Sequence, residues 1–150
     1  MPINYVKGDA VKALKRGGID WLVHCCNCQN KFGSGIARQI KREVPDAYAL
    51  DTWCYKNDKN KLGSAWFSEG GVVNLYGQYY YGTDRRHLSY GALCQGLINI
   101  RNEIKLTPDA KIAFPYKFAS DRAGGDWEIV LELIEWYLGE YDVYIYKLEG

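Results

Sequence analysis

The sequence predicts an α/β protein: a three-layer α/β/α sandwich around a mixed central sheet. Short apolar stretches of strand length alternate with longer stretches whose apolar residues recur every three or four positions, which is typical of helices interleaved with strands. The 150 residues are 47% hydrophobic and 25% charged, which allows a folded core and excludes a disordered or coiled-coil chain. We therefore expect a single domain over residues 1–150.

In the N-terminal half, alternating side chains predict a first strand over residues 3–7. Asp9 follows as the N-cap of a short helix that Gly17 and Gly18 end. The mostly apolar run 19–26 is typical of a buried central strand. A helix over 35–44 is predicted by Ile36, Ile40 and Val44, which share one face. Pro45 closes that helix, and an apolar-aromatic helix is expected from Asp46 through Trp53.

In the C-terminal half, two short apolar stretches, 65–67 and 72–76, flank a Glu-Gly-Gly turn and predict a hairpin. The longest apolar stripe predicts a helix over 90–104. The remaining elements are expected to be a strand over 112–115, a helix over 127–138 and a last strand over 143–148. In such a sheet, ligands bind beyond the carboxyl ends of the strands, so the loops that follow strands are the candidates for function.

Charge and composition exclude several classes of partner. The net charge of +1 provides no global basic field, so neither a nucleic acid nor an anionic membrane is an expected partner. No apolar run approaches the length of a membrane span, and the first residues lack an apolar leader segment. Five cysteines, three of them at positions 25, 26 and 28, indicate reduced thiols and a cytoplasmic location. Nothing in the sequence specifies an oligomeric state.

The most informative stretch is HCCNCQNKFGSGIA, residues 24–37, in which a buried strand leads through a polar loop into a helix. Gly33, Ser34 and Gly35 would allow a ligand close to the backbone, and the free N–H groups before Ile36 suit a phosphate or diphosphate. Asn27, at the strand end, offers donors and an acceptor to a sugar hydroxyl or a water. The alternative is an ordinary helix start with a glycine turn.

These residues resemble the macro domain family, which binds ADP-ribose. The spacing from Asn27 to Gly33-Ser34-Gly35-Ile36-Ala37 is similar to the family's Asn-rich strand end and small-residue triplet, and Lys7-Gly8-Asp9-Ala10 resembles its first-strand motif. His-Cys-Cys-Asn-Cys at 24–28 and Ala-Gly-Gly-Asp-Trp at 123–127 are most similar to the ADP-ribose-1″-phosphate phosphatase-like branch known from yeast and bacteriophages. The chain also resembles the branch of terminal ADP-ribose protein glycohydrolases.

The resemblance implies a set of ligand-binding residues. Asp9 and Ala10 would contact adenine, Asn27 would orient the distal ribose, and Gly33, Ser34, Gly35 and Ile36 would hold the diphosphate. The loop Ala119-Ser120-Asp121-Arg122 would wrap the diphosphate and distal ribose, and Tyr146 would stack on adenine. Two alternatives need no ligand: Asp9 as an N-cap and Tyr146 as a strand-packing residue.

This chain departs from the branch at Ala119-Ser120-Asp121, where a glycine triplet is usual. Losing glycine restricts the backbone, and Asp121 adds a negative charge near a phosphate site. Arg122 would offset that charge by pairing with Asp121 or by binding phosphate itself.

Two residues are candidates for activating water, with no metal or other cofactor required. His24 occupies a position proposed as catalytic in the phosphatase-like branch, and Asp126 would be a general base. The alternatives are a hydrogen-bonded core histidine and the N-cap of the last helix. Strand alternation also puts His24 on the face opposite Asn27, unless the strand end twists.

A zinc site built on His24 and the nearby cysteines is disfavoured, because adjacent strand residues point to opposite faces; core thiols are the better interpretation.

The prediction is therefore a protein that binds ADP-ribose or a derivative and hydrolyses the terminal phosphate of ADP-ribose-1″-phosphate. One alternative is a non-catalytic binder that sequesters an ADP-ribose-derived signal. The other is removal of ADP-ribose from a protein or nucleic acid. Gln78 and Ala123 count against the lysine-dependent form of that chemistry, because they stand where that branch has its lysine and aspartate. We expect either a flap over the site or a solvated loop to be formed by Tyr79 to Tyr81, Arg85, Arg86 and His87.

Overall fold

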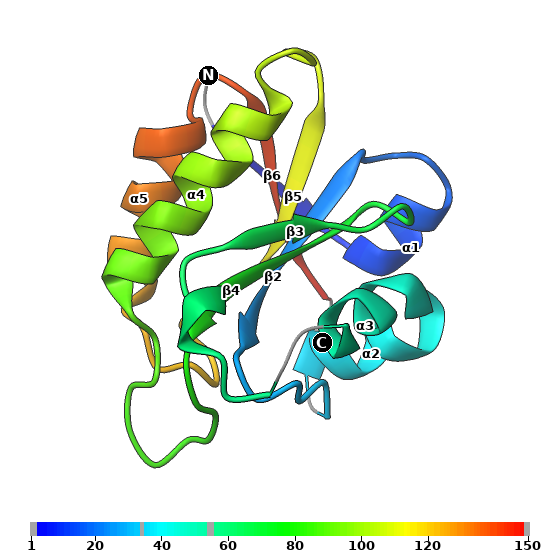
Figure 1. Cartoon of the computed structure of the whole chain (residues 1–150). Helices are drawn as coiled ribbons and strands as arrows, with labels where there is room; N and C mark the ends of the chain where they lie inside the picture. The colour runs from blue at the N-terminus through cyan, green and yellow to red at the C-terminus, as the bar shows by residue number, and fades with distance from the viewer. Residues whose placement is uncertain (1–2, 34, 54–55, 149–150) are drawn as a thin grey trace.

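The computed structural model describes residues 3–33, 35–53 and 56–148. Within them, one six-stranded sheet has the order β1-β6-β5-β2-β4-β3 (Figure 1). The pairs β1–β6, β6–β5, β5–β2 and β2–β4 are parallel, and β3–β4 is antiparallel, so the sheet is mixed. The strands are β1 (Asn4–Lys7), β2 (Trp21–Asn27), β3 (Ala65–Phe67), β4 (Val72–Gln78), β5 (Lys111–Pro115) and β6 (Asp142–Lys147).

Helices cover both faces of this sheet. They are α1 (Ala10–Lys15), α2 (Gly35–Glu43), α3 (Pro45–Thr52), α4 (Tyr90–Ile104) and α5 (Trp127–Leu138), with a short 3₁₀ helix η1 (Lys59–Lys61). Figure 1 shows α4 and α5 together on one face and α1, α2 and α3 on the other. Each face has its own apolar core, so the predicted three-layer α/β/α arrangement is confirmed.

Local chemistry explains where the elements begin and end. The side chains of Asp9, Ser89 and Asp126 cap α1, α4 and α5, and both long helices have the predicted bounds. Strand β2 begins two residues later than predicted, because Asp20 bonds Lys111 with its backbone and its side chain. Helix α2 ends at Glu43, one residue earlier than predicted, because Val44 is the N-cap of the following helix.

The parallel strands bring their carboxyl ends to one edge of the sheet. Here the turn after β1 and the loops after β2, β4 and β5 come together with the end of β6. This edge is where an open α/β sheet holds ligands. In the described part of the chain, no helix has both the length and the apolar character needed to cross a membrane.

Candidate ligand-binding site

A cavity of about 560 Å³ opens at this edge of the sheet. That size is within the range of small-molecule sites in proteins. Its wall includes ten of the residues proposed from the sequence: Asp9, Ala10, His24, Asn27, Gly35, Ile36, Ala119, Asp121, Arg122 and Tyr146. Gly33, Ser120 and Asp126 do not line it, and Ser34 lies outside the described residues.

The turn after β1 contributes a carboxylate to the cavity. Asp9 caps α1 by accepting from the backbone N–H of Lys12 at 3.1 Å. Gln39 on α2 also donates its side-chain amide to both Asp9 oxygens, at 2.9 and 3.1 Å. Burial alone would raise the pKa of Asp9, but these hydrogen bonds outweigh it and lower the pKa. Asp9 is therefore an ionised acceptor in a fixed orientation, and it is an N-cap as well.

The N-terminus of α2 faces an arginine across the cavity. Gly35 has φ +60°, a left-handed conformation that favours glycine, and a Cβ built there would lie 3.9 Å from Arg122 Nε. Both residues line the cavity, as does Ile36. Free N–H groups at a helix N-terminus and a guanidinium are two groups that bind phosphate. Gly33, by contrast, is exposed and does not line the cavity.

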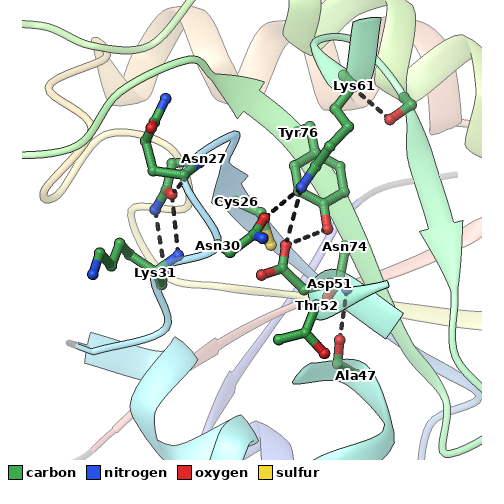
Figure 2. Close-up of polar contacts among 12 residues, drawn as sticks. Cys26, Asn27, Asn30, Lys31, Ala47, Asp51, Thr52, Lys61, Asn74 and Tyr76 are labelled. Carbon is green, nitrogen blue, oxygen red and sulfur yellow. Dashed lines mark hydrogen bonds and ion pairs between the residues drawn. The ribbon is translucent and has the colours of Figure 1, made fainter. Parts of the chain in front are cut away.

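Asn27 reaches the cavity from the end of β2. His24 and Asn27 both line the cavity, which lies at the end of β2. The β2–β4 register shifts between Cys26 and Asn27, where Gly77 of β4 is the extra residue. Figure 2 shows the Asn27 side chain bonded to its own loop. Its Oδ1 accepts from the N–H groups of Gln29 (3.0 Å) and Lys31 (3.3 Å), and its Nδ2 donates to the Lys31 carbonyl (3.1 Å). The side chain is therefore held in one orientation.

The loop after β5 takes a strained path at the position where the resemblance implies glycine. Ala119 is buried and has φ +62°, so an alanine adopts the left-handed conformation there. For an L-residue this costs about 1–2 kcal/mol. The Ala119 carbonyl accepts from Gly125 N–H at 3.1 Å, which holds the loop closed. Asp121 and Arg122 line the cavity, while the Ser120 hydroxyl donates to the Lys117 carbonyl at 3.0 Å.

His24 has the contacts of a core histidine. Asn74 donates its amide to the Ala47 carbonyl at 2.9 Å, so its Oδ1 faces His24 and accepts from Nε2–H at 2.7 Å. The ring is 1% exposed and packs edge-on against Phe32. Burial lowers the pKa of His24 to about 4, and the bond to Asn74 opposes this only in part. The imidazole is therefore neutral at pH 7, with Nε2 committed to Asn74, and its catalytic role stays a prediction.

Asp126 is the N-cap of α5. Its Oδ1 accepts from the N–H groups of Glu128 (2.9 Å) and Ile129 (3.5 Å), and its own N–H donates to the Tyr90 hydroxyl at 2.8 Å. The side chain is exposed and lies outside the cavity wall. This geometry accounts for Asp126 through helix capping, and its role as a base stays a prediction.

Burial keeps the thiols near the site protonated at neutral pH. Burial raises the pKa of Cys25 to about 12, that of Cys28 to about 11, and that of Cys26 well above its usual value. Within residues 3–33, 35–53 and 56–148, no group of three or more His, Cys, Asp or Glu side chains has the placement of a metal site.

Sequence reasoning missed one feature of the cavity wall and left a second one open. Gln39, which orients Asp9, is thirty positions away in the chain, and only its place one turn after Gly35 on α2 hints at a role. The second is the loop after β4. Tyr81, predicted to belong to either a flap over the site or a solvated loop, lines the cavity together with Gly82 and Thr83. That loop is tied to the loop after β5, because the N–H groups of His87 and Leu88 donate to the Ala123 carbonyl at 2.9 and 3.0 Å.

Comparisons with known proteins identify the family. No family model matches the sequence. The chain is 30% identical, over 99% of its length and 98% of the relative's, to an uncharacterized 17.5 kDa protein of Enterobacteria phage T4. It is 36% identical over 62 residues to an ADP-ribose 1″-phosphate phosphatase of Meyerozyma guilliermondii. That match covers 41% of this chain and about a third (35%) of the yeast protein.

Solved structures with a similar fold include macrodomains. A macrodomain protein from Streptomyces coelicolor aligns with TM-score 0.71 and 25% identity over 99% of both chains. The structure named Thermosipho africanus DarTG in complex with ADP-ribose aligns with TM-score 0.76 and 19% identity, over 98% of this chain and 42% of the other. The chain belongs to the macrodomain family, as the sequence resemblance implied. Among its partial relatives are phosphatases of ADP-ribose 1″-phosphate.

Proposed function

We propose that the cavity binds ADP-ribose or a derivative of it. One observation carries the proposal: the cavity wall combines a fixed carboxylate, an anion site and a fixed amide. Gln39, which bonds Asp9, is one helical turn beyond Gly35, or about 6 Å along the helix axis. The carboxylate and the helix terminus therefore belong to the same part of the cavity wall, and α2 links them.

Each group suits one part of that ligand. Asp9 accepts a hydrogen bond from an exocyclic amine such as that of adenine, and the Tyr146 ring offers it an aromatic surface. The helix terminus with Arg122 matches a diphosphate. Asn27 has one amide hydrogen that its loop does not use, which suits a ribose hydroxyl. A solved neighbour carrying ADP-ribose supports the same ligand.

For the reaction, we propose hydrolysis of the terminal phosphate of ADP-ribose 1″-phosphate. The names of the partial yeast relatives support it. In the described part of the cavity wall the carboxylates are Asp9 and Asp121, and Asp9 is engaged by Lys12 and Gln39. Asp121, rather than Asp126, is then the better placed side chain to accept a proton from the attacking water.

The second candidate is a binder without turnover, and Asp121 also motivates it. A terminal phosphate carries nearly two negative charges at neutral pH, and Asp121 would repel it. His24 is neutral and committed to Asn74, so it offers no cation to offset that repulsion. Removal of ADP-ribose from a protein or nucleic acid is less supported. Gln78 lines the cavity and donates to the Tyr80 carbonyl at 2.9 Å, and an amide is no nucleophile.

The test pairs Asp121→Asn with Asp126→Asn and follows both phosphate release and binding of ADP-ribose 1″-phosphate. An enzyme using Asp121 loses roughly 100-fold or more in turnover in the first variant and almost nothing in the second. A binder shows no phosphate release in the wild type and binds the 1″-phosphate more tightly once Asp121 is neutral. Turnover that depends on Asp126 alone would contradict the assignment of Asp121.

A further inference from the structure

A lysine ammonium is buried beneath the loop that carries Asn27. Lys61, the last residue of η1, has a side chain only 2% exposed, and the Asp51 side chain from α3 beside it is fully buried. Figure 2 shows the two side chains meeting next to Asn30, beside the segment that carries Asn27 and Lys31. The Asp51–Lys61 pair lies outside the cavity wall, so it does not touch the proposed ligand.

Among the described residues, three groups surround the ammonium. Lys61 Nζ donates to Asn30 Oδ1 at 2.7 Å and lies 3.7 Å from Asp51 Oδ1. It also lies 4.7 Å from the centre of the Tyr76 ring, a cation–π contact. The shorter of the two polar contacts of this buried charge is therefore the one to the loop.

The carboxylate is held from the other side. Tyr76 donates its hydroxyl to Asp51 Oδ1 at 2.6 Å, while Asp51 Oδ2 has no hydrogen-bond partner among the described residues. Burial raises the pKa of Asp51, although Tyr76 and Lys61 oppose that rise. A buried ion pair contributes little net stability compared with apolar side chains of the same volume. The Asp51–Lys61 pair is therefore better explained by the geometry that it imposes on its neighbours than by a contribution to stability.

That geometry continues into the ligand loop. Asn30 has φ +58°, a left-handed conformation that asparagine tolerates better than most residues. It lies between Gln29 and Lys31, whose N–H groups are the two that hold Asn27 Oδ1. Fixing Asn30 therefore fixes both of the amides that orient the Asn27 side chain.

We propose that Lys61 is a positioning residue for the ligand site: its buried ammonium, held by Asp51 and Tyr76, fixes Asn30 and thereby sets the orientation of Asn27 in the cavity. The predicted effect of Lys61 on ligand affinity rests on the proposed binding of ADP-ribose. The predicted effect of Lys61 on the loop does not depend on any ligand.

The experiment uses three variants of the whole chain. Lys61→Met removes the ammonium and leaves Asp51 without its ion-pair partner. The double variant Lys61→Met/Asp51→Asn removes both charges, so stability recovers while Asn30 still lacks its donor. Asn30→Gly keeps the left-handed backbone available and removes the whole side chain, including the acceptor of the Lys61 bond. Lys105→Met, at the exposed end of α4, is the matched control.

Three quantities are measured for each variant: the thermal midpoint, the affinity for ADP-ribose, and hydrogen exchange at the Gln29 and Lys31 amides. We expect about tenfold faster exchange at both amides in Lys61→Met, in the double variant and in Asn30→Gly. Affinity falls about tenfold in the same three variants, because Asn27 loses its fixed orientation. The control changes neither quantity.

The outcomes separate this proposal from the proposed function. If the double variant regains wild-type exchange and affinity together with its stability, Lys61 is only structural and the proposal is wrong. Unchanged exchange in Asn30→Gly would also overturn it. If the wild type does not bind ADP-ribose, the proposed function fails. The exchange rates then still decide whether Lys61 positions the loop.

Discussion

Placing a carboxylate at position 35 should block ligand binding without unfolding the protein. Gly35 begins α2 and lines the cavity, and a Cβ there meets Arg122 Nε at 3.9 Å with nothing nearer. A glutamate side chain therefore has room to enter the cavity. Its carboxylate would lie at the positive end of the helix and pair with Arg122, occupying the place proposed for the diphosphate.

The hydrogen bonds that the diphosphate would no longer make set the size of the effect. Each charge-assisted hydrogen bond to the ligand contributes about 1.5–3 kcal/mol, so losing those of Arg122 and the helix terminus weakens binding at least about 100-fold. Stability falls less. Gly35 has φ +60°, and an L-residue in that conformation costs about 1–2 kcal/mol.

Calorimetry with ADP-ribose and urea unfolding separate the two effects. Gly35→Ala carries the same backbone cost without the charge, so it should lose stability and keep most of the affinity. Gly33→Glu adds the same charge two residues away, at an exposed position outside the cavity wall, and should bind nearly as the wild type does. Equal loss of affinity in Gly33→Glu and Gly35→Glu would refute the assignment of the phosphate to the α2 terminus.

Three further predictions concern residues whose contacts the structure defines. Because burial lowers the pKa of His24 from 6.5 to about 4, the unfolded state binds its proton first as pH falls. Unfolding free energy should therefore drop by about 2 kcal/mol between pH 8 and pH 5 relative to His24→Gln, as measured by urea titration; equal slopes would contradict this. Asp126→Ala should cost about 1 kcal/mol of stability, because α5 loses its N-cap, and should leave ADP-ribose affinity unchanged. Weaker binding of ADP-ribose in this variant would show that Asp126 belongs to the ligand site. Gly96→Ala should lower the free energy of unfolding by about 1–3 kcal/mol in urea titration, because its Cβ would lie 2.5 Å from Leu75 Cγ. Gly91→Ala, on the same helix, should not be destabilising, because an added Cβ would meet Ser89 Oγ at an ordinary contact distance of 3.9 Å.

The sequence predicts the fold well where signals are long and local. The helices over 90–104 and 127–138 have their predicted bounds, because each carries several turns of apolar periodicity and a capping residue immediately before it. The strands are less well bounded. Residues 19–26 are mostly apolar, and the point where β2 begins depends on the Asp20 side chain, which accepts from the backbone N–H of Lys111 on a neighbouring strand.

The site could be predicted in outline, since the loops after parallel strands meet at one edge of the sheet. The roles of single residues could not. An aspartate before a helix has the same local sequence whether it caps the helix or activates water. Only the structure shows that Asp121 lines the cavity and that Asp126 does not. Lys61 lies in the polar stretch NDKNKLG and gives no sequence signal of burial. Its position depends on Asp51, ten residues earlier, and on Tyr76.

The most direct test of the central claim is a calorimetric titration of the protein with ADP-ribose. The fixed carboxylate at Asp9, the anion site at Gly35 and Arg122, and the amide of Asn27 predict one ligand per chain with a Kd in the micromolar range, about −8 kcal/mol. ADP alone, which lacks the distal ribose that Asn27 would orient, should bind more weakly. Absence of both heat and a thermal shift at millimolar ADP-ribose would contradict the account.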